Sequence, residues 1–454
     1  MQNPWQRVLL IIGIIAGLVF VIRVSLVANS QPNEDVLVHM PYVRLDPTPT
    51  PTPTPTPKPT PKPPPTGDGN QEFRGIWVTR FDWTTSTGAD PAKIDEIVNN
   101  AAYAGFNAIL FQVRGEADAY YTPGLEPWAE RLTGTWGQNP GWDPLASLIQ
   151  KAHARGIQVH AYMNVYPVIL GCSTGPSTNP QHFYYGINSA HGQSGGKLRG
   201  LMWNGAGSVV CGTSEYQRAS PASLYVDNHL LSVGADLLNR YDLDGLHLDH
   251  IRYASGASCD PVSLCRYYGH DENCGLSLSC PLSNGGYRDW QRAQVNGTVE
   301  KFFDLVAGRN DGLWLTGAVW PTYIDYWGWG YTEGYHDYFQ DSKAWLRDDY
   351  IDAIMPMLYS WNTTTDPFRL DRWKTLVADY QNSSAGRYVI PGIGGTAFLS
   401  FSQIEARINY ARQVGTIGHA IFSYGYMEDY GYFDDLAAGP YSQPASVPNI
   451  PWHN

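Results

Sequence analysis

Residues 144–165, PLASLIQKAHARGIQVHAYMNV, contain an amphipathic helix pattern followed directly by an apolar strand pattern. We expect the helix over Pro144–Arg155, because Asp143 in front of Pro144 matches an N-cap followed by proline at the first helical position. We expect the strand over Gln158–Val165. A largely apolar strand beside a helix is typical of a parallel sheet that helices cover.

The same strand-and-helix unit recurs along the chain from about residue 72. Strand patterns occur at Arg74–Thr79, Asn107–Val113, Gln158–Val165, Gly245–His250, Leu313–Pro321, Ala353–Tyr359, Arg387–Gly394 and His419–Tyr426. Helix patterns lie between them, for example at Pro91–Ala104, Pro144–Arg155, Pro221–Arg240, Arg288–Ala307 and Ser402–Val414. Eight such strands predict an α/β fold, a (β/α)8 TIM barrel. A doubly wound open sheet is the alternative, but no GxGxxG turn follows the first strand.

The chain is longer than a minimal barrel, and the surplus falls in two places. Residues 67–454 number 388, against roughly 250 for a typical barrel. Long insertions follow the third and fourth strands, at Tyr166–Ser220 and Ile251–Tyr287. In such barrels, loops after the strands lie on the C-terminal face, where active sites are found.

Both insertions contain cysteines, and these indicate disulfides. The six cysteines are Cys172, Cys211, Cys259, Cys265, Cys274 and Cys280. An even number of cysteines in loops rich in Gly, Ser and Asn is typical of an exported, disulfide-bonded protein. We expect one bridge between Cys172 and Cys211 and two more among the last four. A zinc site made by the last four is the alternative, although their spacings contain no CxxC pair.

The N-terminus carries an export segment. Val8–Ile22 is an apolar run of 15 residues that follows Arg7. It matches the charged and apolar regions of a signal peptide. Residues 1–28 are therefore expected to be a signal peptide cleaved after Ala28, or an uncleaved anchor that crosses the membrane with Arg7 inside. In both cases the rest of the chain lies outside the cytoplasm, in contact with the membrane only through this segment.

A linker separates the export segment from the barrel. Residues 46–66, DPTPTPTPTPTPKPTPKPPPT, have proline at nearly every second position, which favours an extended polyproline II spacer. We expect a Pro/Thr-rich linker over 29–71, a catalytic barrel over 72–440 and a C-terminal tail over 441–454.

Composition narrows the class of ligand. The chain has 42 acidic and 30 basic residues, a net charge of −12, so it lacks the basic surface that nucleic acids require. Aromatic residues make up 13% of the chain. They suit stacking against neutral, hydroxyl-rich ligands such as sugars, or the filling of a core. We expect a polysaccharide partner, and neither a metal nor a cofactor.

The alternation of side chains along the strands predicts which polar residues meet at the barrel mouth. In Gly245–His250, leucines at 246 and 248 suit the helix side, which turns His247 and Asp249 inward. The same argument applied to the other strands, and to the residues just beyond their ends, selects the candidate site. The expected substrate-binding residues are Arg114, Asp118, Tyr162, Asn164, His247, His250, Arg252, Trp320, Tyr359, Trp361, Tyr424 and Glu428.

Two carboxylates at strand ends, with aromatic walls, are what glycoside hydrolysis requires. Asp249 is the first candidate, because Arg252 nearby would keep it ionised as a nucleophile or base. Glu116 is the candidate proton donor, with Glu428 and Asp118 as rivals. The alternatives are that Asp249 only forms a salt bridge and that Glu116 is a solvated loop acid.

Several motifs resemble those of one family. They are RGIWVTRFDW at 74–83, the run from FQVRGEADAYY to HAYMNVY at 111–166, DGLHLDHIRY at 244–253 and MPMLYSW at 355–361. In this order they resemble the glycosyl-hydrolase-like 10 family of exported bacterial proteins. The resemblance implies a (β/α)8 barrel that cleaves peptidoglycan glycan strands stripped of their stem peptides. It also implies a catalytic role for Glu116 and for Asp249, whereas the second acid or tyrosine of the family's signature is here His250.

Three functions remain open from the sequence. The first is a surface-tethered glycosidase that acts on peptidoglycan or another cell-envelope glycan. The second is a barrel that binds carbohydrate without catalysis. The third is a metal-dependent hydrolase in which His160, His247 and Asp249 hold an ion, although no strand carries the HxH pair usual in such barrels.

Overall fold

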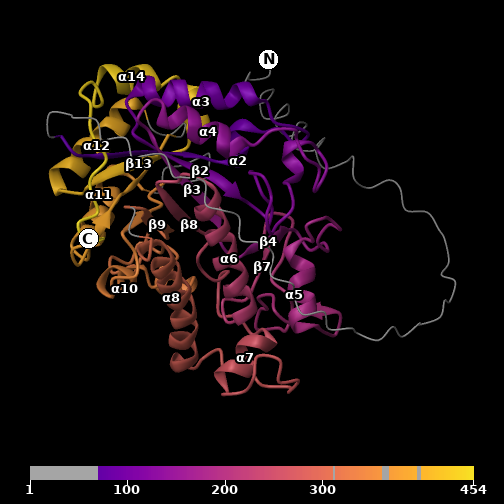
Figure 1. Cartoon of the computed structure of the whole chain (residues 1–454). Helices are drawn as coiled ribbons and strands as arrows, with labels where there is room; N and C mark the ends of the chain where they lie inside the picture. Colours follow the sequence, from indigo (N-terminus) through magenta and orange to yellow (C-terminus); the bar gives the residue numbers. More distant parts are fainter. Residues whose placement is uncertain (1–69, 310–311, 360–367, 396–399, 454) are drawn as a thin grey trace, which may run out of the picture. The chain divides into compact units, whose positions relative to one another are not determined.

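A parallel β-sheet forms the centre of the computed structural model, which describes residues 70–309, 312–359, 368–395 and 400–453 (Figure 1). Its strands pair in the order β11-β10-β9-β8-β3-β2-β1-β13-β12, and every pair is parallel. These strands are β1 (Phe73–Val78), β2 (Ala108–Arg114), β3 (Gln158–Asn164), β8 (Gly245–Asp249), β9 (Trp314–Val319), β10 (Ala353–Pro356), β11 (Tyr388–Val389), β12 (Gly392–Gly394) and β13 (Gly418–Phe422).

The sheet closes on itself through residues 388–394. β11 and β12 stand at opposite ends of the strand order, yet only Ile390 and Pro391 separate them in the chain. The amide of Ile390 donates to the carbonyl of Ile354 in β10 at 2.9 Å, and the carbonyl of Pro391 accepts from the amide of Ala420 in β13 at 3.1 Å. β11 and β12 are therefore two parts of one strand, interrupted where proline has no amide to donate. The predicted eight-stranded barrel is confirmed.

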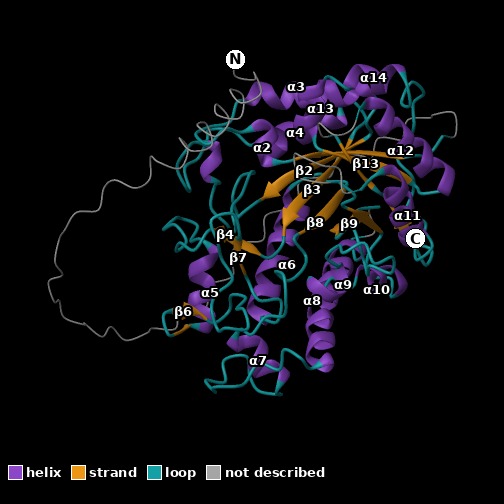
Figure 2. Cartoon of the chain, turned by 180° about the vertical axis from the view of Figure 1, so that it is seen from behind, coloured by secondary structure: helices purple, strands orange, loops and turns teal. Residues whose placement is uncertain are grey.

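Helices cover the outside of the barrel (Figures 1 and 2). They are α3 (Pro91–Ala104), α4 (Pro144–His153), α6 (Leu224–Arg240), α8 (Gly285–Ala307), α9 (Gly334–Asp337), α10 (Ser342–Arg347), α11 (Leu370–Gln381), α12 (Phe401–Val414) and α14 (Phe433–Ala438). The short helices α2 (Arg80–Trp83) and α13 (Tyr424–Tyr430) instead follow directly on the C-terminal ends of β1 and β13. As predicted, α3 and α4 begin at proline, with the side chains of Asp90 and Asp143 accepting from helix amides. The helix predicted at Pro221–Arg240 begins three residues later, at Leu224, because its N-cap is Ser223, whose side chain accepts from the amide of Val226.

Side chains alternate between two apolar cores. Leu246 and Leu248 of β8 pack into the outer core with the helices. His247, between them, lies inside the barrel, where the centroid of its ring is 5.7 Å from that of Trp77 and 5.4 Å from that of Tyr162. The predicted inward direction of His247 is therefore confirmed.

The two insertions have their own local structure. The first contains β4 (Pro167–Leu170), α5 (Phe183–His191), β5 (Gln193–Ser194), β6 (Lys197–Leu198) and β7 (Tyr216–Arg218), and the second contains α7 (Pro261–Tyr267). Disulfides join Cys172 to Cys211, Cys259 to Cys280 and Cys265 to Cys274. The predicted bridge from Cys172 to Cys211 is confirmed, as are the two bridges among the last four cysteines.

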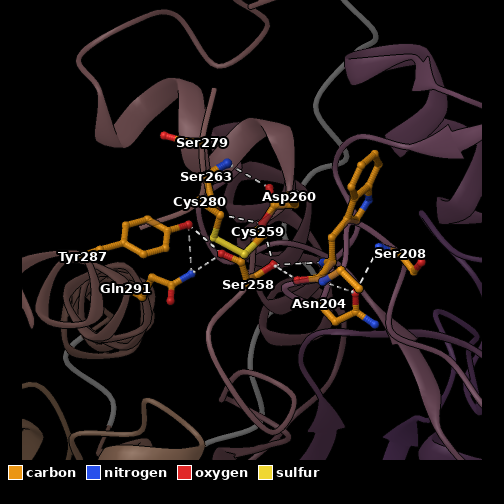
Figure 3. Close-up of a disulfide and its surroundings, with 12 residues drawn as sticks. Asn204, Ser208, Ser258, Cys259, Asp260, Ser263, Ser279, Cys280, Tyr287 and Gln291 are labelled. Atoms are coloured by element: carbon orange, nitrogen blue, oxygen red, sulfur yellow. Dashed lines mark hydrogen bonds between the residues drawn. A yellow bond between two sulfur atoms is a disulfide. The ribbon is translucent and has the colours of Figure 1, made fainter. Parts of the chain in front are cut away.

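A buried carboxylate joins the two insertions beside the Cys259–Cys280 bridge (Figure 3). Asp260 accepts hydrogen bonds from the hydroxyls of Ser220, Ser258 and Ser263 at 3.1, 2.8 and 2.6 Å. The amide of Cys259 donates to the carbonyl of Trp203, in the first insertion, at 2.8 Å. The insertions therefore form one connected layer after strands β3 and β8.

The predicted export segment, and the predicted linker except for its last two residues, 70 and 71, lie outside the described residues. Among the helices that the structure does describe, none is long and apolar enough to cross a membrane. Three disulfides indicate an extracytoplasmic location for the barrel.

Candidate active site

Asp249 is the last residue of β8, and its carboxylate is held at both oxygens. The hydroxyl of Tyr162 donates to Oδ2 at 2.8 Å. Oδ1 accepts from the amide of His250 at 2.5 Å and from the guanidinium of Arg252 at 3.2 Å. Burial by itself raises the pKa of Asp249, but the charge of Arg252 and the donated hydrogen bonds hold that pKa well below its usual range. The carboxylate is therefore ionised at any physiological pH.

The pKa of Glu116 is shifted in the opposite direction from that of Asp249. It lies in the loop after β2, and its carboxylate accepts from the amide of Leu170 at 2.9 Å and lies 3.5 Å from the guanidinium of Arg80. Burial and the neighbouring carboxylate of Asp118 raise the pKa of Glu116, and these effects outweigh Arg80 and the amide of Leu170. A raised pKa suits a group that must carry a proton before it donates one.

Beside these two acids lies a cavity of about 460 Å³ at the C-terminal ends of the strands. It is lined by Thr79, Arg80, Phe81, Asp82, Gln112, Tyr162, Asn164, Tyr216, His250, Phe422, Ser423, Gly425, Tyr426, Glu428 and Asp429. Neither Asp249 nor Glu116 is part of this lining. Each contacts a residue that is: Asp249 contacts Tyr162, and Glu116 contacts Arg80.

The predicted substrate-binding residues divide into two groups. Four of them line the cavity: Tyr162, Asn164, His250 and Glu428. Arg252 does not line the cavity; its guanidinium lies 3.2 Å from the carboxylate of Asp249 and 5.4 Å from the ring centroid of Trp320. Glu428 is bound by the ammonium of Lys93 at 2.5 Å. The carboxylate of Asp118 turns back on its own loop and accepts from the amides of Gly115 and Glu116, both at 2.8 Å.

Arg114 is a correction to the predicted site, because it is fully buried and does not line the cavity. Its guanidinium donates to the carbonyls of Val165 and Pro167, just beyond β3, at 3.0 and 3.2 Å. The pairing of β2 with β3 shifts by one residue between Gln112 and Arg114, so Arg114 lies opposite Met163, which faces the helices. Its guanidinium forms a bidentate ion pair with Glu126 at 2.7 and 2.8 Å and has no exposed surface. The side-chain alternation fails here because a bulge reverses it.

His247 is inside the barrel, as predicted, but it does not line the cavity. Its Nε2 accepts from the indole of Trp77 at 3.1 Å, and its Nδ1 is 2.9 Å from the hydroxyl of Thr316. Burial lowers the pKa of His247 to about 3, so the ring is neutral. Both nitrogens are therefore engaged within the protein. Among the described residues, no group of three His, Cys, Asp or Glu side chains is arranged to hold a metal ion.

Three of the aromatic residues predicted to bind substrate, Trp320, Tyr359 and Tyr424, do not line the cavity. Tyr359 stacks on Phe422 inside the barrel at 4.5 Å between ring centroids. Trp320 lies 3.9 Å from the ring of Tyr338. Tyr424 is a correction: β13 ends at Phe422 and α13 begins at Tyr424, whose hydroxyl accepts from Asn100 of α3 at 2.8 Å. Strand alternation does not apply within a helix. Trp361 lies outside the described residues.

Two charged residues after β1 were missed by the sequence analysis. The guanidinium of Arg80 lines the cavity and donates to the hydroxyl of Tyr216 at 2.8 Å. The carboxylate of Asp82 lines it too, and accepts from the amide of Thr79 at 2.7 Å and the hydroxyl of Ser423 at 3.2 Å. Burial raises the pKa of Asp82 to about 6. The available signal was their position directly after a barrel strand, which is the argument that selected Asp249.

Known proteins are similar to this chain in sequence. The sequence profile of the family described as glycosyl hydrolase-like 10 matches residues 72–390, more than half of the chain. Glycosyl hydrolase YngK of Bacillus subtilis (strain 168) is 23% identical over 418 residues, which cover 84% of this chain and 74% of that protein. Glycosyl hydrolase DigH of Escherichia coli (strain K12) is 25% identical over 339 residues, which cover 67% of this chain and 69% of that protein.

Solved structures resemble the barrel. The glycoside hydrolase domain of PgaB (BpsB) from Bordetella bronchiseptica matches with a TM-score of 0.53 at 12% identity, over 80% of this chain and 98% of that one. The α-L-fucosidase isoenzyme 2 from Paenibacillus thiaminolyticus matches with a TM-score of 0.52 at 14% identity, over 82% of this chain and 49% of that one. At these identities the likeness concerns the fold alone.

These findings agree with the motifs along the chain. The family and both relatives carry the name glycosyl hydrolase, which confirms the predicted class of enzyme, a glycoside hydrolase. The family profile spans all strands from β1 to β11 and includes Glu116 and Asp249. The chain belongs to the glycosyl hydrolase-like 10 family.

Proposed function

We propose that this enzyme hydrolyses O-glycosidic bonds in a cell-envelope polysaccharide, and that its substrate is the glycan strand of peptidoglycan after removal of the stem peptides. The observation that carries the proposal is the ionised Asp249, held by Tyr162, His250 and Arg252 at the carboxyl end of β8. Motifs at 74–83 and 244–253, which resemble the family, support the choice of glycan.

In the proposed reaction the two acids take opposite roles. Glu116, whose pKa is raised, donates a proton to the departing glycosidic oxygen. Asp249, whose pKa is depressed, acts as the carboxylate that attacks the anomeric carbon or activates water. Tyr162 and Asn164 line the cavity next to Asp249 and would contact the sugar ring. Tyr162 and Arg80 line the cavity and contact Asp249 and Glu116, so the reaction requires the substrate to pass these two side chains to reach the acids.

The rest of the chain fits an enzyme at the cell surface. We propose that residues 1–28 export the chain and either stay as an anchor or are removed, and that 29–71 form a spacer before a barrel at 72–440 and a tail at 441–454. The disulfides support export, because such bonds persist in oxidising compartments. A spacer would give a tethered barrel reach into a polymeric substrate.

The test is a search for products. The purified full chain would be incubated with intact peptidoglycan, with amidase-stripped peptidoglycan, and with a panel of other envelope and plant glycans. Mass spectrometry of the soluble fraction should show saccharides released from stripped peptidoglycan in preference to intact peptidoglycan. Release from a different glycan alone would reject the substrate, and binding to a glycan without any release would favour a carbohydrate-binding barrel.

A further inference from the structure

The loop between β9 and α9 gathers aromatic rings outside the cavity. Residues 320–333, WPTYIDYWGWGYTE, include Tyr326, Trp327, Trp329 and Tyr331. None of these four lines the cavity, and none was selected by the sequence analysis. Tyr326 is 63% exposed, the largest exposed fraction among the large apolar side chains that the structure describes. One exposed ring that continues into three partly buried ones makes this loop a candidate binding surface.

The loop is held by its own hydrogen bonds. The carboxylate of Asp325 accepts from the amides of Gly330 at 2.7 Å and Tyr331 at 3.3 Å, and Glu333 accepts from the amide of Asp325 at 2.8 Å. Gly328 and Gly330 have φ angles of +67° and +77°, which other residues adopt only with strain. The turn therefore has a fixed shape, and both carboxylates are engaged by backbone amides.

Within this turn one tryptophan supports the other. The rings of Trp327 and Trp329 are stacked, with centroids 4.7 Å apart and planes 19° apart. Arg372 of α11 lies 4.9 Å from the centroid of Trp329, and it donates to the hydroxyl of Tyr331 at 2.6 Å. Trp329 is thus in contact with both Trp327 and Arg372. Tyr326, whose ring meets that of Trp327 edge to face at 6.1 Å, is the exposed end of the cluster, while Trp327 is partly buried.

The loop that carries the cluster is connected to the candidate active site by three consecutive contacts. The indole of Trp320 donates to the carbonyl of Thr332, in the same loop, at 2.9 Å. The guanidinium of Arg252 lies 5.4 Å from the ring centroid of Trp320, and 3.2 Å from the carboxylate of Asp249. β9 is also the direct neighbour of β8 in the barrel. A ligand that extends from the cavity across the C-terminal face can therefore meet this loop.

We propose that Tyr326 and Trp327 form a distal subsite that stacks against a pyranose ring of an extended glycan chain, outside the cavity. This inference rests on the proposed function. The cavity, at about 460 Å³, is in the lower half of the range for small-molecule sites, so a polymeric substrate must continue beyond it. Aromatic faces bind the apolar C–H face of a sugar and leave its hydroxyls in water. The subsite therefore recognises chain length.

The experiment compares short and long strands on the full chain. Amidase-stripped glycan strands would be separated into disaccharides and long oligomers, and dissociation constants measured for Asp249→Asn and for the double variant with Tyr326→Ala. We expect roughly a 2- to 12-fold weaker binding of long strands, the range for one aromatic contact, and no change for disaccharides. In the otherwise unmodified enzyme, Tyr326→Ala should raise KM for long strands by the same factor and leave kcat unchanged. Tyr103→Ala is the matched control, because Tyr103 lies on α3 and is 61% exposed.

The outcomes distinguish a failure of the proposed subsite from a failure of the proposed hydrolysis. If Tyr326→Ala leaves the preference for long strands intact, or if Tyr103→Ala weakens it equally, the subsite is wrong, whether or not saccharides are released. If long strands bind better through Tyr326 but nothing is released, the subsite is supported and the proposed hydrolysis fails. If strands of no length bind, both are overturned.

Discussion

The hydroxyl of Tyr162 on β3 donates a hydrogen bond to Oδ2 of Asp249 on the neighbouring strand β8, at 2.8 Å. The pairing of the strands sets up this contact, because His247 lies opposite Tyr162 and Asp249 lies opposite Asn164 in the register. Tyr162 also lines the cavity. One side chain therefore orients the candidate catalytic carboxylate and forms part of the wall that a substrate would touch.

Tyr162→Phe should lower kcat and move the acidic limb of the activity profile to higher pH. The pKa of Asp249 lies below its usual range in part because of this hydroxyl, so its loss lets that pKa rise. The ionised fraction of Asp249 then begins to fall at a higher pH as the solution is acidified. The measurement is the pH dependence of kcat/KM. Tyr121→Phe is the control, because its buried hydroxyl has no hydrogen-bond partner; an equal shift there would contradict the assignment.

Asp82→Asn should change how stability depends on pH. Burial raises the pKa of Asp82 to about 6, so between about pH 4 and pH 6 the folded state binds more protons than the unfolded state. The stability contributed by protonated Asp82 is complete below about pH 4 and is lost as pH rises through 6. The amide variant should flatten this fall in urea unfolding experiments. Asp90→Asn, at the exposed N-cap of α3, is the matched control for the same chemical substitution.

Glu126→Gln should destabilise the barrel, although Glu126 does not line the cavity. Glu126 and Arg114 form a fully buried ion pair, and Glu126 is also 2.9 Å from His229 of α6. Removal of one partner leaves a buried guanidinium without its counter-charge, which costs about 3–5 kcal/mol. Asp348→Asn removes the acid of an exposed pair with Arg347 and should cost less than about 0.5 kcal/mol. Equal losses in urea unfolding would show that the buried pair has no special weight.

Removal of the Cys259–Cys280 bridge should loosen the second insertion before the barrel melts. The bridge spans 21 residues, and its neighbour from Cys265 to Cys274 spans 9, so the first restricts the unfolded chain more. Asp260 lies beside the bridge (Figure 3), and it accepts hydrogen bonds from three serines. Replacing both cysteines by serine should speed amide exchange in 251–287 and weaken glycan binding. Unchanged affinity after complete loss of protection there would contradict the idea.

Much of the fold could be predicted because it depends on local patterns. Apolar strands, Asp-Pro helix starts and the cysteine spacing identified the eight strands and the C-terminal face with its insertions. The closure of the barrel at Pro391 adds only a short interruption to a strand that the pattern had already marked.

The site was predicted less completely, and the reasons are physical. Alternation works while a strand is regular, so it gave the direction of His247, Asp249 and Tyr162. It failed for Arg114, where a bulge shifts the register, and for Tyr424, where the chain has already become a helix. Arg80 and Asp82 were missed because α2 is four residues long and leaves almost no helical pattern in the sequence.

The most direct test of the account is the rate of saccharide release by the full chain and by its Asp249→Asn variant on amidase-stripped peptidoglycan, followed by mass spectrometry. Asn keeps the shape of the side chain and its contact with Tyr162 but removes the charge. The account predicts a fall in rate of at least about 100-fold, the lower end of what a positioned acid or base contributes, with the fold and glycan binding retained. Release at an undiminished rate from the folded variant would contradict it.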